Sequence, residues 1–592
     1  MNPSEEYQNR RQLRIEAGEH WKRLDGIVAN LRLAAGVSFF ILAWLAISPG
    51  ALSGWWLFLP AAIFVGLASH HDRIRLHGLR AKRAVAFYER GLARIEDRWI
   101  GAGDPGRAFF DESHLYATDL DLFGKGSLFE LLSAARTRSG EETLASWLKA
   151  PASRNEILRR QRAVDELRTR IDLREDLAVL GQDVRAAIHP EWMKRWGAAP
   201  AVLESRAARL LAPILSACML ASLIDYFGFY GSGWLMIAAL GAGGVFGQHY
   251  RKRVRAVTDA VADPVKDLVT LSLILARLET EEWKGEKLSE LRAALETHGQ
   301  PASQAVHRLV LLIEWLNSRL NPGFAAIAPL LVWATQFGFA IESWRARHGA
   351  GIGRWLDAVG EFEALCALAA YAYEHPDDSF PEIIETGTYF EGEDLRHPLL
   401  PLGRCIPNSV RLDRDLQLFI VSGSNMSGKS TLLRTIGVNV VLALAGGPVH
   451  AKRVRLSILA IGATIRVLDS LQGGTSRFYA EIQRLHDIME LTKRTPVLFL
   501  LDEILHGTNS HDRAVGAEGV IRGLIDRGAI GLVTTHDLAL ARLADALVPR
   551  AANFHFEDQL EDGRMVFDYR LHPGVVQKSN ALALMRAVGL EV

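Results

Sequence analysis

The feature that most constrains this chain is a glycine-rich octapeptide, GSNMSGKS, which runs from Gly423 to Ser430. It follows the apolar run LQLFIVS (416–422) and precedes TLLRTIGVNVVLAL, a segment with the composition of a helix. A turn of this kind between a strand and a helix points backbone N–H groups inward, where they can cradle phosphate oxygens. Lys429 would neutralise the phosphates, and the Ser430 hydroxyl would help to hold Mg²⁺. The octapeptide therefore predicts a P-loop in an α/β domain.

Two further apolar runs end in residues suited to the same chemistry. PVLFLLD (496–502) brings Asp502 and Glu503 to a strand end, and AIGLVTT (529–535) is followed by His536. Asp502 would bind the magnesium ion, and Glu503 would orient or deprotonate the attacking water. His536 would contact the γ-phosphate. We therefore expect Lys429, Glu503 and His536 to be catalytic and Ser430 with Asp502 to hold the metal, whereas the phosphate-binding loop consists of Gly423, Ser424, Asn425, Met426, Ser427, Gly428, Lys429, Ser430 and Thr431.

The N-terminal half contains two long apolar stretches. Residues 33–68 carry no charged side chain and are divided by Ser48-Pro49-Gly50, whereas residues 210–247 carry only Asp225. Lysine and arginine flank both stretches and are absent from the turns within them. This distribution is typical of helical hairpins that enter a membrane with both ends in the cytoplasm. The alternative is a pair of helical hairpins buried in a soluble core.

The surroundings of these stretches support an anchored protein with a cytoplasmic ATPase. The N-terminus is charged and lacks the apolar core of a signal peptide, and the three cysteines (Cys218, Cys366 and Cys405) are widely spaced, as in a reducing compartment. We expect the chain in the cytoplasmic membrane, with its ATPase domain in the cytoplasm. A wholly cytoplasmic protein is the alternative.

The remaining pattern predicts a multi-domain protein that is mainly α-helical before residue 383 and α/β after it. Apolar residues recur at helical spacing in five segments, 128–148, 157–180, 254–295, 304–320 and 357–373. Residues 323–341 are apolar enough for a further membrane span, although Pro329 makes a buried helix as good an interpretation. We place the boundaries at 1–110, 111–382 and 383–592. The first two regions each contain one hairpin, and the third contains the ATPase motifs.

The motifs of residues 383–592 resemble, as a set, the nucleotide-binding domain of the MutS family. The matching segments are GSNMSGKST, GGTSRFYAEI, LLDEILHGTNSHD, TTHD, RHP (396–398), IPN (406–408), YRLHPG (569–574) and KSNA (578–581). Residues 119–151, 159–168 and 359–373 resemble, more loosely, the helical core and lever of the same family. The resemblance implies a P-loop ATPase of the ABC type that moves helical levers and a clamp-like region around residues 260–340.

The resemblance also implies a homodimer with two composite ATP sites. Ser476 would reach the γ-phosphate bound by the other copy, and Asn509 and Asp512 would lie at the seam between copies. Tyr569 would stack on the adenine. The position that usually carries an aromatic residue before the P-loop is Cys405 or Ile406 here, which weakens the adenine contact that the resemblance implies.

Whether the chain binds DNA is open at the level of sequence. The family resemblance favours DNA, but lysine plus arginine and aspartate plus glutamate each number 68, so no basic excess supports it. Phe87-Tyr88-Glu89 matches the Phe-x-Glu of mismatch readers, yet it lies in an amphipathic helix and we interpret the match as coincidence. The alternative function is a membrane-associated coupling ATPase that acts on a protein or lipid partner.

Overall fold

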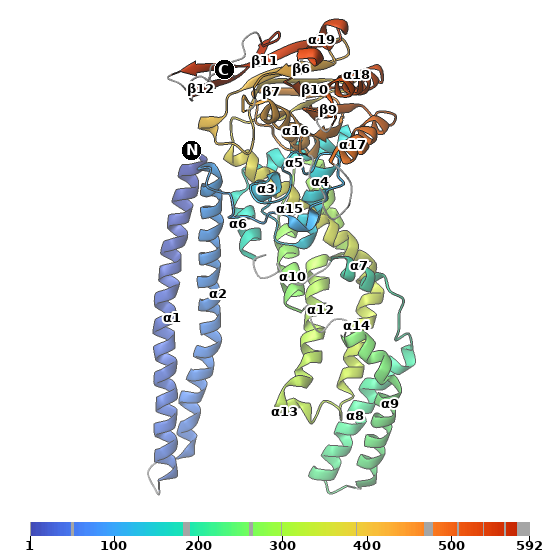
Figure 1. Cartoon of the computed structure of the whole chain (residues 1–592). Coiled ribbons are helices and arrows are strands. Elements are labelled where there is room, and N and C mark those ends of the chain that lie inside the picture. Colours follow the sequence, from blue (N-terminus) through green and yellow to red (C-terminus); the bar gives the residue numbers. More distant parts are fainter. Residues whose placement is uncertain are drawn as a thin grey trace.

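The computed structural model describes residues 2–576 except 49–52, 181–189, 232, 260–264, 298, 386, 425, 467–476, 506–507, 537 and 562–563. Most of it is helical, and an α/β region lies at the C-terminal end of the chain (Figure 1). The change from helices to mixed sheets comes after α15 (Ile352–Glu374), close to the predicted boundary at residue 383.

The α/β region is built on a six-stranded sheet in the order β12-β11-β6-β10-β9-β8. The strands from β11 to β8 pair in parallel, and β12 closes one edge antiparallel to β11. Three of the parallel strands are the apolar runs predicted from sequence. The strand bounds are β6 Leu418–Ser422, β8 Ala460–Thr464, β9 Val497–Asp502, β10 Ile530–Thr535, β11 Ala551–Glu561 and β12 Arg564–Pro573.

Helices cover this sheet, and a second sheet lies beside it. The helices are α16 (Lys429–Ala445), α17 (Arg477–Leu491), α18 (Ser510–Asp526) and α19 (Leu538–Ala546). The second sheet has the order β3-β7-β4-β5, with bounds Glu382–Ile383, Arg453–Leu456, Phe390–Leu395 and Asn408–Leu412, and a 3₁₀ turn at Leu402–Arg404 precedes β5. Because α16 and α15 are both almost wholly buried, they join the sheet to the helical part in one continuous core.

The helical part surrounds α15 and extends away from the sheet as an arm. The inner helices are α3 (Leu128–Leu132), α4 (Arg138–Lys149), α5 (Arg154–Arg168), α6 (Ile171–Leu180) and α7 (Pro190–Ala198), after a 3₁₀ turn at Arg107–Phe109. The arm contains α10 (Val265–Glu279), α11 (Glu286–Ala294), the short pair β1 (Glu296–Thr297) and β2 (Gln300–Pro301), α12 (Ala302–Asn317), α13 (Pro322–Ala325) and α14 (Trp333–His348), with 3₁₀ turns at Ser318–Leu320 and Gly349–Gly351.

The two predicted hairpins are present as helix pairs. The first joins α1 (Pro3–Ile47) to α2 (Phe58–Ile95) through a 3₁₀ turn at Gly54–Leu57, and the second joins α8 (Arg206–Gly228) to α9 (Gly233–Asp259). Their closed ends lie at the end of the molecule opposite the α/β region (Figure 1). Phe40 is 74% exposed, and many other large side chains of the two apolar stretches, among them Trp44, Leu210 and Trp234, are also exposed. The hairpins are therefore not buried in a soluble core.

Two described helices, α1 and α8, are long and apolar enough to cross a membrane by length and composition. Only 6% of the apolar window of α1 and 28% of that of α8 is buried in the molecule. A core helix of a soluble protein would be mostly buried, and these two are not.

From the sequence, residues 323–341 are interpreted as a further membrane span or as one buried helix. Both interpretations are wrong, because these residues form no single helix. The chain ends α13 at Ala325, continues through turns and begins α14 at Trp333. Pro329 lacks the N–H that a continuing helix would need, and Val332 adopts a left-handed φ of 49°. The segment is therefore neither a further span nor one buried helix.

The Phe87-Tyr88-Glu89 triplet lies in the amphipathic part of α2. Phe87 and Tyr88 are buried against Tyr7 of α1, and the Tyr88 hydroxyl donates a hydrogen bond to Glu175 of α6. The two aromatic rings hold the base of the first hairpin against the helical core, which accounts for them without a role in DNA recognition.

Candidate nucleotide-binding site

The loop between β6 and α16 takes its shape from residues with left-handed backbone angles. Gly423 has φ 153°, Met426 has φ 72° and Gly428 has φ 105°. Positive φ is readily adopted by glycine, so the two glycines permit the loop to double back before α16 begins at Lys429. The positive end of α16 therefore opens onto the loop, as an anion-binding site requires.

Lys429 is buried and lies across this loop. Its Nζ donates to the carbonyl oxygens of Gly423 and Ser424, each at 2.8 Å, and lies 3.6 Å from Oε1 of Glu503. Burial lowers the pKa of the Lys429 ammonium, and the negative charges of Glu503 and Asp502 offset part of that effect. A bound phosphate would add negative charge beside a cation that its surroundings compensate incompletely.

Two hydroxyls in the loop are suited to an anionic ligand. The Oγ atoms of Ser424 and Ser427 are buried, and neither has a hydrogen-bond partner among the described residues. Leaving a buried hydroxyl unpaired costs free energy, so such atoms in a loop that faces a helix N-terminus indicate a ligand that accepts hydrogen bonds. Phosphate oxygens fit this requirement.

The strand ends bring Asp502, Glu503 and His536 together beside Lys429. The Thr534 hydroxyl donates a hydrogen bond to Asp502, and the Glu503 N–H contacts the carbonyl oxygen and the hydroxyl of Thr534, both at 3.2 Å. Nδ1 of His536 lies 3.5 Å from Oε1 of Glu503. Glu503 has a left-handed φ of 47°, a strained conformation of the kind found at functional sites.

Ser430 and Asp502 offer some, but not all, of the oxygen ligands that Mg²⁺ requires. Ser430 is half-buried on the first turn of α16, and Asp502 ends β9. No cluster of three or more histidine, cysteine, aspartate or glutamate side chains that could hold a metal occurs among the residues described. Magnesium is commonly bound by one or two carboxylates together with water and substrate phosphates, so one aspartate and one hydroxyl suffice only with a phosphate ligand present.

A pocket of about 470 Å³ opens beside the loop. Its walls include Gly428, Thr431, Cys405, Ile406 and Tyr569. The volume falls within the range of small-molecule sites. Tyr569 has φ 54°, and its carbonyl oxygen accepts a hydrogen bond of 3.0 Å from the Asn408 side chain. The pocket therefore contains both the tyrosine and the substituted aromatic position singled out above.

Other residues implied by the family resemblance are located as follows. Asn509 caps α18 and bonds to Asp512 through its side-chain oxygen and nitrogen, at 2.9 and 2.7 Å. Asn425 and Ser476 fall outside the described residues, as does the KSNA segment.

Sequence reasoning missed a buried carboxylate that joins this domain to the helical part. Asp119 accepts the N–H groups of Ile465 and Arg466, each at 2.7 Å, and Arg484 of α17 at 3.0 Å. Arg434 of α16 donates to its main-chain oxygen at 3.0 Å. Burial raises the pKa of Asp119, and the two backbone N–H groups counter it. An aspartate in DLDLF carries no motif, so only the folded chain reveals this role.

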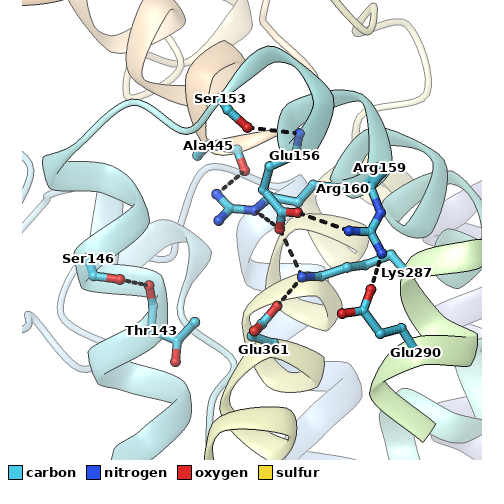
Figure 2. Close-up of polar contacts among 10 residues, drawn as sticks. All are labelled: Thr143, Ser146, Ser153, Glu156, Arg159, Arg160, Lys287, Glu290, Glu361 and Ala445. Carbon is cyan, nitrogen blue, oxygen red and sulfur yellow. Dashed lines mark hydrogen bonds and ion pairs between the residues drawn. The ribbon is translucent and has the colours of Figure 1, made fainter. Parts of the chain in front are cut away.

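The opposite end of α16 is also held by charged side chains (Figure 2). Arg160 of α5 donates to the carbonyl oxygen of Ala445 at 3.4 Å and to Glu156 at 3.1 Å. The buried Lys287 of α11 lies between Glu156, at 2.9 Å, and Glu361 of α15, at 2.5 Å. A cation at a helix C-terminus interacts favourably with the free carbonyl groups there. Helix α16 is therefore fixed to the arm through α5, α11 and α15.

Comparison with known proteins gives two family matches. The model of MutS domain V matches residues 419–591, and the model of MutS domain III matches residues 114–226. The first includes the loop, the strand ends and Tyr569. The second includes Asp119, the helices from α3 to α7 and most of α8.

Similar proteins carry the name DNA mismatch repair protein MutS. One from Natronomonas pharaonis is 32% identical over 237 residues, which are 39% of this chain and 27% of that protein. One from Desulfosudis oleivorans is 34% identical over 238 residues, or 38% of this chain and 26% of its own. DNA mismatch repair protein MutS 2 from Halobacterium salinarum is 32% identical over 237 residues, with shares of 39% and 27%. The matched part thus spans about a quarter of each relative's length.

Proposed function

This chain belongs to the MutS family, and we propose that it is a membrane-anchored, Mg²⁺-dependent ATPase whose nucleotide cycle moves the helical arm. The observation that carries the proposal is the position of Lys429. It is a buried cation over a glycine-containing loop, next to Glu503 and to two buried hydroxyls for which the described part of the chain offers no hydrogen-bond partner.

Each residue of the site has a distinct task in this proposal. Lys429 and the loop N–H groups bind the β- and γ-phosphates and stabilise the charge that builds up on them during transfer. Glu503 orients the water that attacks the γ-phosphorus, the bond from that phosphorus to the β,γ-bridging oxygen breaks, and ADP and phosphate leave. His536 lies on the same side and contacts the γ-phosphate. Ser430 and Asp502 would hold Mg²⁺, which supplies neutralisation of phosphate charge.

The deciding experiment is ATP binding and hydrolysis by the purified full-length protein. We expect Lys429→Ala to lower ATP affinity at least tenfold and to abolish turnover, because the loop then lacks its cation. The matched control is Lys452→Ala, which removes an exposed lysine of the same domain whose side chain is 70% exposed. Unchanged affinity and turnover in Lys429→Ala would overturn the assignment of the site.

We further propose that two copies associate through composite ATP sites, with Ser476 of each reaching the phosphates bound by the other. This follows the family resemblance, and its test is light scattering with and without ATP. The mass is expected to double with ATP, and to stay doubled in Glu503→Gln, where hydrolysis is blocked. A mass that does not respond to ATP in either protein would contradict it.

Membrane anchoring is supported by the exposed apolar arms and by the basic residues at their bases. Arg206, Arg209, Arg251, Lys252, Arg253 and Arg255 are exposed at the base of the second hairpin, where anionic lipid headgroups would meet them. We expect the chain in the cytoplasmic membrane with its ATPase domain in the cytoplasm. Release of the protein from membranes by high salt without detergent would count against it.

DNA binding is the second candidate function, favoured by the mismatch-repair relatives. It predicts a DNA affinity that rises with ATP and falls steeply with salt concentration. If that affinity is absent while lipid vesicles stimulate ATP hydrolysis, the coupling ATPase without DNA is the better description.

A further inference from the structure

The distal end of the arm is formed by an apolar segment whose role the nucleotide site does not explain. From Leu320 to Ile341 the chain contains no charged side chain. Residues 320–332, here named the arm tip, include α13 and the turns after it, and they connect α12 to α14 at the arm's far end (Figure 1).

Apolar side chains of the arm tip face outward. Leu320 is 72% exposed, Ile327 45% and Leu330 36%, and Trp315 at the end of α12 is also exposed. The ring of Trp333 meets that of Phe324 edge-on and that of Phe337 at a tilt, and its indole N–H donates to the carbonyl oxygen of Trp315 at 2.6 Å. The tip is therefore a structured apolar surface in contact with the solvent.

The arm tip packs against the middle of the second hairpin. The Ser216 hydroxyl of α8 donates to the carbonyl oxygen of Leu331 at 2.5 Å, and Gln336 donates to the same hydroxyl at 2.7 Å. Val332 packs against α9 at Gly243 and Gly247. The tip is thus fixed in depth relative to the hairpin.

That depth can be estimated from helix geometry. Arg209 is the last basic residue before the apolar part of α8, and Ser216 lies seven residues further along the helix. At 1.5 Å per residue the contact with Leu331 is about 10 Å beyond Arg209 along the axis. If the basic base of the hairpin meets lipid headgroups, the arm tip lies within the hydrocarbon of the near leaflet.

The backbone of the arm tip suits such an environment. Unpaired backbone N–H groups are costly in hydrocarbon, so a non-helical segment can enter only if its own turns bond them. Local carbonyl oxygens accept hydrogen bonds, between 2.9 and 3.2 Å, from the N–H groups of Phe324, Ala325, Ile327, Ala328, Leu331, Val332 and Trp333.

We infer that the arm tip is a third membrane-contacting element, which dips into the bilayer beside the second hairpin without crossing it. The inference rests on the membrane anchoring proposed above and deepens it by naming lipid acyl chains as the partner of the arm. A surface that gripped nucleic acid would carry lysine or arginine for the phosphates, and the arm tip carries neither.

The test uses full-length protein in phospholipid vesicles that contain lipids with a nitroxide on the acyl chain. Single cysteines replace Ile327 in the arm tip, Leu220 on the apolar part of α8 and the exposed Gln304 on α12. Each variant also carries Cys218→Ser, and each is labelled with an environment-sensitive fluorophore. The Cys218→Ser protein without a new cysteine gives the baseline from Cys366 and Cys405.

We expect the labels at Ile327 and Leu220 to be quenched several-fold more than the label at Gln304. Quenching at Leu220 but not at Ile327 would overturn the inference while leaving membrane anchoring in place. Absence of quenching at both positions would overturn insertion of the second hairpin and the inference together. A response of the Ile327 label to duplex DNA, without quenching by lipid, would identify the arm tip as a DNA contact and also overturn it.

Discussion

Lys429 illustrates how a single residue can be held ready for a ligand. Its ammonium binds two carbonyl oxygens of its own loop at 2.8 Å, whereas Oε1 of Glu503 lies at 3.6 Å. Neutral carbonyl groups satisfy its hydrogen bonds and leave much of its charge unbalanced in a buried position. A triphosphate that reached this loop would supply the missing charge and partners for the two hydroxyls nearby.

Substitution of Glu503 by glutamine should separate binding from chemistry. The amide keeps the size of the side chain but is a poor base, so we expect kcat to fall at least a hundredfold while ATP affinity changes by less than about threefold. Isothermal titration and single-turnover hydrolysis measure the two effects. Loss of affinity equal to the loss of kcat would assign Glu503 to binding instead.

Tyr569 offers a test of the base pocket. We expect Tyr569→Ala to raise the KM for ATP about five- to tenfold with little change in kcat, because it removes one wall of the pocket, and Tyr569→Phe to preserve the KM through the retained ring. Equal effects of both substitutions would mean that the hydroxyl matters and stacking does not. Steady-state hydrolysis with ATP and GTP measures the outcome.

The sequence singles out Lys429, Asp502 and His536 as candidates because the glycine-rich loop and the strand ends are local patterns. The glycines between Gly423 and Ser430 predict a turn, Asp502 ends one apolar run, and His536 follows another, and both runs form buried strands. Asp119 is different, since its partners Ile465 and Arg484 lie more than 340 residues away. Pairing of that kind depends on tertiary packing, to which the local sequence gives no signal.

At the scale of elements, α16 connects the glycine-containing loop to the helices that carry the arm. Its first residue is Lys429, and its last carbonyl group receives Arg160, which shares Glu156 with Lys287 (Figure 2). A shift of α16 would therefore change the geometry around α5 and α11. Gly446, with φ 94°, ends the helix at the point where Arg160 packs against it.

Lys287→Met tests this junction and should cost about 2 kcal/mol of unfolding free energy, between the values for exposed and fully buried ion pairs. Burial raises the pKa of Glu156, but Lys287 and Arg160 outweigh it, so the pKa lies below its usual value. A lowered folded-state pKa gives stability that is present above the unfolded pKa and lost as pH falls through the folded one.

The cost of Lys287→Met should therefore be full near neutral pH and should shrink as the pH falls below about 4.5, the usual pKa of glutamate. Denaturant unfolding at several pH values measures it, with Lys284→Met as the control, since Lys284 is exposed on the neighbouring turn. A cost that does not depend on pH would assign the effect to packing alone.

The elements themselves are predictable to different degrees. The hairpin helices follow from uninterrupted apolar runs with turn residues between them. Residues 323–341 do not, because composition alone cannot reveal that the chain turns at Pro329 and packs Val332 against Gly243 and Gly247. The outcome depends on a neighbouring hairpin that lies about a hundred residues earlier in the sequence.

At the scale of the whole molecule, the distribution of exposed apolar surface distinguishes a membrane protein from a soluble one. Phe40 on α1 is 74% exposed and lies in the uncharged stretch of residues 33–68. Leu13 is 57% exposed and lies in the charged part of the same helix. In water, arginine at either exposed position would change stability by only about 0.5 kcal/mol. In a bilayer, arginine in the apolar arm costs roughly 2.5–3.5 kcal/mol.

We therefore expect Phe40→Arg to reduce membrane insertion of the first hairpin, seen as increased extraction by alkaline carbonate, while Leu13→Arg behaves as the unaltered protein. The extraction is measured in a chain whose second hairpin has been made polar, because an intact second hairpin would keep the protein in the membrane. ATP hydrolysis should persist in both variants, because the site lies at the opposite end of the molecule (Figure 1). If Phe40→Arg and Leu13→Arg extract equally, the apolar arm does not meet lipid, and its exposed surface must instead be covered by protein.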